Sequence, residues 1–235
     1  MHDSRYACTM NVFDVSQPTV AIAGRDERFA VRRVFCIGKN YAAHVRELGG
    51  NPDREPPFYF SKAADTVTPD GSVVAYPPRT RNFHHEIELV VAIGKAGADI
   101  PAARAAEYIF GYAVGIDLTR RDLQAEAKNA GRPWDTAKNF DQSAPIGAIH
   151  TVDEVGHPTG GRIWLAVNGA ARQDADVGEM IWSVAESIAE TSTFCALAPG
   201  DLIFTGTPAG VGPLSPGDKV TGGIAGIGEI SIEIR

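Results

Sequence analysis

Residues 82–94, NFHHEIELVVAIG, place two glutamates at the start of a stretch that otherwise has the pattern of a buried strand. The stretch is rich in β-branched residues and lacks a helical period, so it predicts β-structure. Side chains two residues apart in a strand share a face, so Glu86 and Glu88 point the same way. Two neighbouring buried carboxylates repel each other and lose their hydration. The stretch therefore requires a nearby cation, unless this end of the strand is a solvated edge.

Short β-branched runs separated by turn residues extend through the whole chain, which contains 25 glycines and 15 prolines. This composition indicates many strands, tight turns and few long helices. We therefore predict an α+β fold in which β-structure dominates. A chain of 235 residues is long enough to bury a large core. We divide it into an N-terminal arm, residues 1–30, and one catalytic domain, residues 31–235.

Local patterns predict the individual elements. Gly49 and Gly50 end a short predicted helix. Asn168-Gly169 is a two-residue hairpin signal between two strands. Besides the strand that holds the glutamates, strands are predicted at 31–38, 58–63, 108–117 and 162–173, a strand that runs into a glycine-rich turn at 200–212, and a turn at 68–71. Helices are predicted at 39–48, 118–131 and 180–193, and a first helical turn at 101–107.

Charge and composition argue against several classes of protein. The net charge is −7 and the basic residues are scattered, whereas a nucleic-acid-binding protein is expected to carry a basic face. No apolar run approaches the ~20 residues of a membrane span, and the first residues lack the pattern of a secretory signal. We expect a soluble, cytoplasmic protein without nucleic-acid or membrane partners. Cys8, Cys36 and Cys195 are widely spaced, which argues against a disulfide framework or a thiolate zinc site.

A third carboxylate, Asp117, ends the apolar run GYAVGID, so it lies at a strand end. With Glu86 and Glu88 it supplies three hard oxygen ligands, a set that suits Mg²⁺ or Mn²⁺ better than Zn²⁺. Acidic strand ends are also common without a metal, and the spacing alone leaves both interpretations open. His84 and His85 precede the glutamates without an HExxH pattern, and we interpret them as supporting or surface residues.

Three further features suit catalysis, and each has an ordinary alternative. His44 and Glu47 are three residues apart on the predicted helix, so Glu47 could orient the imidazole as a base that activates water. Lys138 could stabilise an oxyanion. The TGTP turn at 205–208 offers N–H groups and hydroxyls to an anion. The alternatives are a solvated helix face, a surface lysine and a simple turn.

Five stretches occur in an order and at separations that resemble the fumarylacetoacetate hydrolase family, in particular its small acylpyruvate and fumarylpyruvate hydrolases. They are GKNYAAHVRE, NFHHEIEL, GYAVGIDLTRRDLQ, TAKNF and GDLIFTGTPAGVG, and the likeness extends from about Val34 to the C-terminus. The resemblance implies a mixed β-roll or sandwich packed with a few helices, and a homodimer. Lys39 stands where the family often has Arg, and Ala63 where it often has Pro, which affects substrate detail.

The resemblance also implies a role for ten residues of this chain. Three hold a divalent metal, Mg²⁺ or Mn²⁺, two form the acid–base pair of a lid helix, one is the active-site lysine, and four contact the substrate. In that order they are Glu86, Glu88 and Asp117; His44 and Glu47; Lys138; and Arg121, Gln124, Gly206 and Thr207. Tyr41 and Lys62 match recurrent positions without an assigned role.

The implied activity is hydrolysis of the C3–C4 bond of a 2,4-dioxo acid to pyruvate and a carboxylic acid. Fumarylpyruvate is the expected substrate, which indicates a role in aromatic catabolism, and Lys39 and Arg46 beside the lid could pair with its second carboxylate. One alternative is a general acylpyruvate hydrolase, and another is a metal-dependent decarboxylase or hydratase acting on oxaloacetate or a 2-oxo-enoic acid. A third is a non-catalytic small-molecule-binding protein. His44 and Glu47 favour hydrolysis, because decarboxylation needs no activated water.

Overall fold

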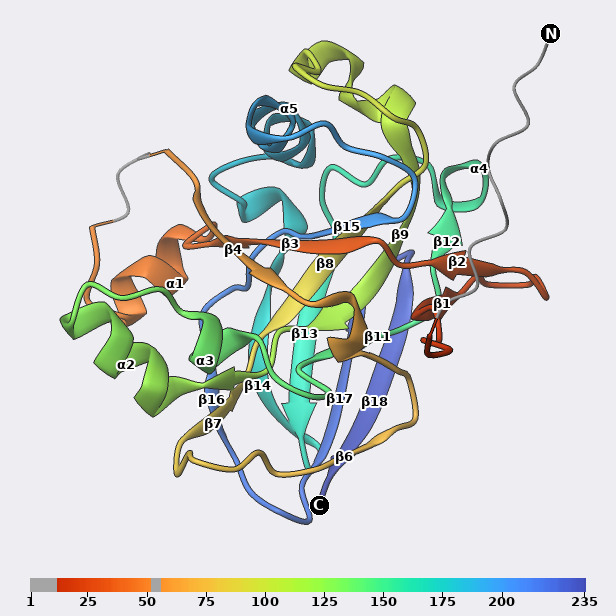
Figure 1. The fold of residues 1–235 in the computed structure, drawn as a ribbon. Coiled ribbons are helices and arrows are strands. Elements are labelled where there is room, and N and C mark those ends of the chain that lie inside the picture. The colour runs from red at the N-terminus through yellow and green to blue at the C-terminus, as the bar shows by residue number, and fades with distance from the viewer. Residues whose placement is uncertain (1–11, 52–55) are drawn as a thin grey trace, which may run out of the picture.

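The computed structural model describes residues 12–51 and 56–235, and within them the fold is α+β with β-structure dominant, as predicted (Figure 1). The largest sheet has the strand order β4-β3-β15-β8-β9-β11-β5, with β12 paired to β9. Its strands are β3 (Arg33–Gly38), β4 (Phe58–Lys62), β5 (Val67–Pro69), β8 (Ile87–Ile93), β9 (Ile109–Ile116), β11 (Ala144–Ile146), β12 (His150–Thr151) and β15 (Asp201–Phe204).

A second sheet has the order β14-β13-β17-β18-β6 and packs against the first. It consists of β6 (Val73–Val74), β13 (Arg162–Val167), β14 (Ala170–Asp176), β17 (Lys219–Ile224) and β18 (Gly228–Ile234). Two small sheets complete the β-structure: β1 (Thr19–Ala21) with β2 (Arg28–Ala30), and β7 (Phe83–His85) between β10 (Thr119–Arg120) and β16 (Gly212–Leu214).

The helices are short, and three of them gather at one end of the large sheets (Figure 1). These three are α1 (Ala42–Glu47), α2 (Arg121–Asn129) and α3 (Asp135–Lys138). The others are α4 (Val152–Val155), α5 (Val184–Phe194) and the 3₁₀ segments η1 (Ala64–Thr66), η2 (Ala102–Tyr108) and η3 (Val177–Glu179). Within the described ranges, no helix has both the length and the apolar character needed to cross a bilayer.

Strand β8 is buried on both faces and separates two hydrophobic clusters. Ile87 and Leu89 belong to the cluster that the second sheet covers, whereas Val90 and Ala92 belong to a cluster that also includes residues of β3 and β15. Glu88 lies on the same face as Val90, because alternate residues of a strand share a face. The glutamate therefore ends an apolar row inside the protein, at the end of β8 that is close to α2 and α3.

Several element boundaries differ from the sequence prediction for local reasons. Helix α5 begins at Val184 rather than 180, because Ser183 and Glu186 form a capping box there. Helix α1 begins at Ala42 rather than 39, because Lys39 is left-handed (φ 61°) and cannot continue a helix. The stretch at 200–212 begins as β15 and then continues into a turn in which Gly206 and Gly210 have positive φ, as predicted. The hairpin at Asn168-Gly169 is confirmed, with φ of 52° and 79° at these residues.

The predicted N-terminal arm is described only from residue 12. Its hairpin, β1 and β2, packs against the body, and Val20, Ile22 and Phe29 are buried in the cluster that contains Val90. The division of the chain at residue 30 stays a prediction. Cys8 lies outside the described residues, and Cys36 and Cys195 are free thiols.

Candidate metal centre

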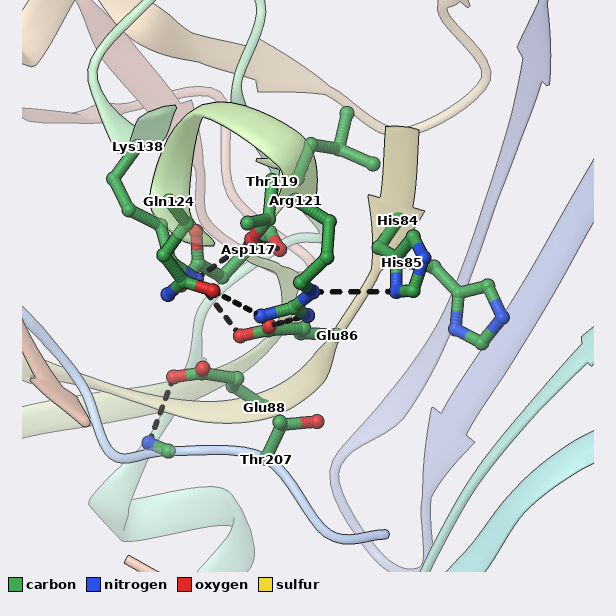
Figure 2. Close-up of polar contacts among 12 residues, drawn as sticks. His84, His85, Glu86, Glu88, Asp117, Thr119, Arg121, Gln124, Lys138 and Thr207 are labelled. Atoms are coloured by element: carbon green, nitrogen blue, oxygen red, sulfur yellow. Dashed lines mark hydrogen bonds and ion pairs between the residues drawn. The ribbon is translucent and has the colours of Figure 1, made fainter. Parts of the chain in front are cut away.

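Glu86, Glu88 and Asp117 meet where β8 begins and β9 ends (Figure 2). Each offers a carboxylate oxygen, and these oxygens all lie within 4.8 Å of one another. The antiparallel register of β8 and β9 explains the meeting: Ile87 pairs with Ile116, and the backbone N–H of Asp117 donates to the carbonyl of Glu86 at 2.8 Å. The structure thus brings together the three carboxylates that the sequence placed on one strand face and at one strand end.

Three cations neutralise two of these carboxylates. The Nζ of Lys138 lies 2.9 Å from Oε2 of Glu86 and 2.5 Å from Oδ2 of Asp117, and Arg121 also pairs with Glu86. The Nζ of Lys62 lies 2.9 Å from Oδ1 of Asp117. Burial alone would lower the pKa of Lys138, but Asp117 and Glu86 outweigh it and the pKa is raised. Lys138 is therefore a fixed positive charge rather than a base.

Of the three carboxylates, Glu88 is the one without an ion pair among the described residues. It is 2% exposed and accepts one hydrogen bond, from the backbone N–H of Gly206 at 2.7 Å. Burial, together with Asp117 and Glu86, raises its pKa well above the ordinary value. A buried carboxylate in this position must take up a proton or bind a cation. The donor set, three carboxylates with Glu88 unneutralised, fits Mg²⁺ or Mn²⁺.

The loop at 205–208 supplies that hydrogen bond at the cost of an unusual backbone. Gly206 has φ of 96°, and a Cβ at this position would lie 2.7 Å from the Cβ of Asn40. Only glycine allows both the conformation and the close approach to Asn40. From the sequence we expected this N–H to face an anion, and in the structure it donates to Glu88.

His44 and Glu47 form the predicted pair on α1. The Nδ1 of His44 lies 3.0 Å from Oε2 of Glu47, whose Oε1 accepts the backbone N–H of Gly210 at 3.0 Å. His44 is 5% exposed and lines an inner cavity of about 30 Å³ together with Glu86 and Glu88. A cavity of this size holds a water molecule or an ion. With Nδ1 bound to Glu47, Nε2 is the ring nitrogen available to a ligand.

Arg121 and Gln124, from the first turns of α2, line the same cavity. Arg121 donates through Nη1 to Oε1 of Gln124 and through Nε to Nδ1 of His84 at 3.3 Å. Burial and the charge of Arg121 lower the pKa of His84 to about 4. The ring of His84 is therefore neutral at physiological pH and holds Arg121 in place, with its Nε2 donating to Asn82 at 2.7 Å. The sequence left a supporting and a surface role open for this histidine, and its contacts fit the supporting one.

Sequence analysis missed Gln173 of β14, which is fully buried. Its amide nitrogen donates to Oγ1 of Thr207 at 2.8 Å and to the carbonyl of Pro208 at 2.9 Å. Its amide oxygen accepts the N–H of Ile87 and Nδ1–H of His85, both at 3.1 Å. Gln173 therefore ties the 205–208 loop to the residues on both sides of Glu86, the side chain of His85 and the backbone of Ile87. The local pattern, AARQDAD, does not distinguish it from its polar neighbours.

We expect Gln173→Leu to lower the free energy of unfolding by roughly 2–4 kcal/mol, because it leaves the buried N–H of Ile87 without a partner. Gln17→Leu is the matched control, since that glutamine is exposed and bonds only backbone carbonyls; its cost should stay below about 1 kcal/mol. Urea unfolding measures both. Equal costs for the two variants would contradict the role given to Gln173.

Because the carboxylates repel one another, we also expect the stability of the fold to depend on a bound divalent ion. Without divalent ions at pH 7.5, Glu88→Gln should unfold with a free energy about 1–2 kcal/mol higher than the wild type, because it removes an unpaired buried charge. The folded pKa of Glu88 is raised, so this difference should shrink as the pH falls and be absent below the ordinary value of 4.5. Added Mg²⁺ should reverse the order by stabilising only the wild type. If the wild type remains less stable than Glu88→Gln in unfolding curves with Mg²⁺ as well as without it, a metal on Glu88 is excluded.

Comparison with known proteins places this arrangement in a family. Residues 33–235 match the model of the fumarylacetoacetate (FAA) hydrolase C-terminal region, and the chain belongs to the fumarylacetoacetate hydrolase family. Within that family it is fumarylpyruvate hydrolase-like. It is 48% identical to fumarylpyruvate hydrolase from Ralstonia sp over 180 residues, which cover 77% of this chain and 93% of the relative.

Two other relatives bear on the chemistry. The crystal structure of fumarylpyruvate hydrolase from Pseudomonas aeruginosa in complex with Mn²⁺ and pyruvate has a TM-score of 0.94 at 51% identity, and the match covers 96% of this chain and 99% of that chain. The mitochondrial oxaloacetate tautomerase FAHD1 of Mus musculus is 41% identical over 204 residues, which cover 87% of this chain and 92% of the relative. The family thus includes hydrolases and tautomerases of small 2-oxo acids.

Proposed function

We propose that this protein hydrolyses the C3–C4 bond of a 2,4-dioxo acid, with fumarylpyruvate as the preferred substrate and Mg²⁺ or Mn²⁺ held by Glu86, Glu88 and Asp117. The observation that carries the proposal is the buried, unneutralised Glu88, which shares an inner cavity with His44. The likeness to an enzyme crystallised with Mn²⁺ and pyruvate supports both the ion and the product. When bound, the ion would polarise the 2-oxo acid end of the substrate and offset its negative charge.

His44 and Glu47 supply the base in this proposal. Glu47 accepts a hydrogen bond from Nδ1–H of His44, which leaves Nε2 free to take a proton from a water molecule in the inner cavity. The oxygen of that water adds to C4, and the C3–C4 bond breaks with its electron pair moving to C3. C3 then takes a proton and becomes the methyl carbon of pyruvate, while C4 leaves as the carboxylate carbon of the acid product.

Three further residues would position the substrate and its charges. Lys138 is a permanent cation in the cavity wall and would stabilise the oxyanion that forms at C4. Arg121 and Gln124, fixed to each other, would contact the keto-acid end. Gly206 and Thr207 would close the pocket from the opposite side, where Gln173 and Glu88 anchor their loop.

The main rival is a reaction on oxaloacetate, because relatives at about 40% identity include oxaloacetate tautomerases. Decarboxylation needs no activated water, so it leaves His44 and Glu47 without that task, and the pair favours hydrolysis over decarboxylation. Tautomerisation is a proton transfer that can use the same base, so the assays below must separate it from hydrolysis. A non-catalytic binding protein on the same fold would have no use for a base aimed at a metal centre.

Steady-state assays with Mg²⁺ on fumarylpyruvate, acetylpyruvate and oxaloacetate test the proposal. We expect kcat/KM to be highest for fumarylpyruvate, with pyruvate and fumarate formed in equal amounts. A preference for acetylpyruvate would replace the assignment by a general acylpyruvate hydrolase. Turnover of oxaloacetate alone would replace it by the rival.

We also propose a cytoplasmic homodimer, the assembly that the family resemblance implies. Light scattering after size exclusion should give about twice the 25.0 kDa mass of one chain. A mass equal to one chain at micromolar concentration would exclude the dimer.

A further inference from the structure

A second, outer pocket of about 240 Å³ adjoins the metal centre between α1 and α2. The two are continuous, because they share six lining residues: Lys39, His44, Leu48, Arg121, Gln124 and Trp134. The inner cavity, at about 30 Å³, has room for an ion or a water molecule but not for an acyl chain. If the proposed function holds, the acyl group beyond C4 must extend into the outer pocket.

The outer pocket combines apolar walls with two unpaired cations. Val45 of α1 and Leu48, the residue after this helix, line it together with Trp134, whereas Lys39 and Lys128 are exposed and contribute charge. No acidic residue lines the pocket among the described residues, and within them neither lysine has an ion pair. A surface lysine normally faces water or an acid. Two lysines beside one apolar pocket instead indicate a ligand with an apolar middle and an anionic end.

Arg121, the third cation of the pocket wall, cannot serve this end of the ligand. Its guanidinium is held by Glu86, Gln124 and His84 on the metal side. Arg46, which the sequence offered as a partner for a second carboxylate, lines neither the inner cavity nor the outer pocket. We therefore assign the role considered for Arg46 to Lys128, a residue of a different helix.

Lys39 is held at the pocket by the backbone around it. It has φ of 61°, a conformation that residues other than glycine rarely adopt, directly after the end of β3. The next residue, Asn40, is anchored through its side chain to the carbonyl of Thr205 at 2.7 Å and to the backbone of Trp182. An anchored left-handed turn sets the direction in which Lys39 leaves the main chain.

We propose that Lys39 and Lys128 determine specificity by binding a second carboxylate at the far end of the acyl group. The proposal rests on the proposed function and adds the residues that select its substrate, a 2,4-dioxo acid whose acyl group is a short dicarboxylate, such as fumaryl. In fumarylpyruvate a rigid, planar two-carbon link separates C4 from the second carboxylate. That link would lie against Trp134 and Leu48, with the carboxylate between the two ammonium groups.

Single variants test this assignment by a difference between two substrates. Lys128→Gln and Lys39→Gln should each lower kcat/KM for fumarylpyruvate about ten- to a hundredfold, the scale of one lost charge-assisted contact. The loss for acetylpyruvate, which has no second carboxylate, should stay below about threefold. Lys128→Arg should recover most of the activity on fumarylpyruvate. The control is Lys219→Gln, an exposed lysine of β17 that lines neither cavity and should change nothing.

The outcomes separate the subsite from the reaction. Hydrolysis of neither substrate by the wild type would reject the proposed function. Hydrolysis of both, with equal losses for both in Lys128→Gln, would reject only the subsite. Arg46→Gln tests whether direct contact is needed. If its loss of kcat/KM is confined to fumarylpyruvate and equals the loss in Lys128→Gln, the charge of the region, rather than contact, sets the preference.

Binding without turnover gives a second readout. Fumarate titrated against Mg²⁺-loaded protein should change the tryptophan emission, since Trp134 lines the outer pocket. We expect Lys128→Gln to raise the Kd for fumarate about tenfold or more. Crotonate, which replaces the second carboxylate by a methyl group, should bind the wild type and the variant equally. Equal Kd values of the two proteins for fumarate would overturn the assignment even if hydrolysis is confirmed.

Discussion

Removal of divalent ions by exhaustive chelation is expected to abolish hydrolysis of fumarylpyruvate, and Mg²⁺ or Mn²⁺ to restore it. Glu88→Ala should lower kcat/KM by at least about 10³-fold, because the loss of a divalent ion removes several kcal/mol of charge stabilisation. The physical basis is the pairing in the site: Lys138, Lys62 and Arg121 neutralise Glu86 and Asp117 and leave Glu88 without a counter-charge.

The control for this experiment is Glu107→Ala, which removes an exposed glutamate that pairs with Arg104 on the surface. It should keep wild-type activity and wild-type metal affinity. Calorimetric titration with Mn²⁺ separates a lost metal from a lost fold, since Glu88→Ala should remain folded and bind Mn²⁺ poorly. Full activity of the wild type after chelation would end the metal hypothesis.

His44→Ala is expected to lower kcat for hydrolysis by roughly 10²–10⁴, the usual contribution of a general base. The affinity for Mn²⁺ should change little, because His44 lies on α1 and is not one of the three clustered carboxylate ligands. Glu47→Gln should cause a smaller loss of the same kind, since the amide still accepts a hydrogen bond from Nδ1 but does not stabilise a charged imidazole.

A reaction that needs no activated water provides the control for His44. Any decarboxylation of oxaloacetate by the wild type should fall far less than hydrolysis in His44→Ala. His150→Ala, a change to a half-buried histidine on β12, should affect neither reaction. Equal losses of both activities in His44→Ala would show that the histidine supports the structure of α1 instead of supplying a base.

The parts of the site that the sequence predicted depend on short-range geometry. Glu86 and Glu88 were placed on one face by the period of a strand, and His44 and Glu47 on one face by the period of a helix. Asp117 was recognised because it ends an apolar run. In each case the relation spans a few residues of one element, so it holds even where the element boundary was wrong, as at α1.

The residues that the sequence did not reveal depend on contacts between distant segments. Gln173 bonds residues 34 to 88 positions away, and Lys62 reaches Asp117 from β4. Nothing in the neighbourhood of either residue indicates these partners. In the sequence, Lys128 is an ordinary basic residue near a helix C-terminus. It lines the outer pocket only because α1 and α2 lie on the two sides of that pocket. The left-handed conformation of Lys39 is likewise set by the anchoring of Asn40 to distant residues, so local propensity does not predict it.

Hydrolysis in H₂¹⁸O tests the central claim most directly, because it follows the oxygen that His44 is proposed to activate. Fumarylpyruvate is incubated with Mg²⁺-loaded enzyme, and the fumarate formed is analysed by mass spectrometry; its carboxylate oxygens do not exchange with water at neutral pH. Our account predicts fumarate with a single ¹⁸O atom, in an amount equal to the pyruvate released, and no fumarate after chelation. Fumarate without the label, or conversion of oxaloacetate with no cleavage of fumarylpyruvate, would contradict it.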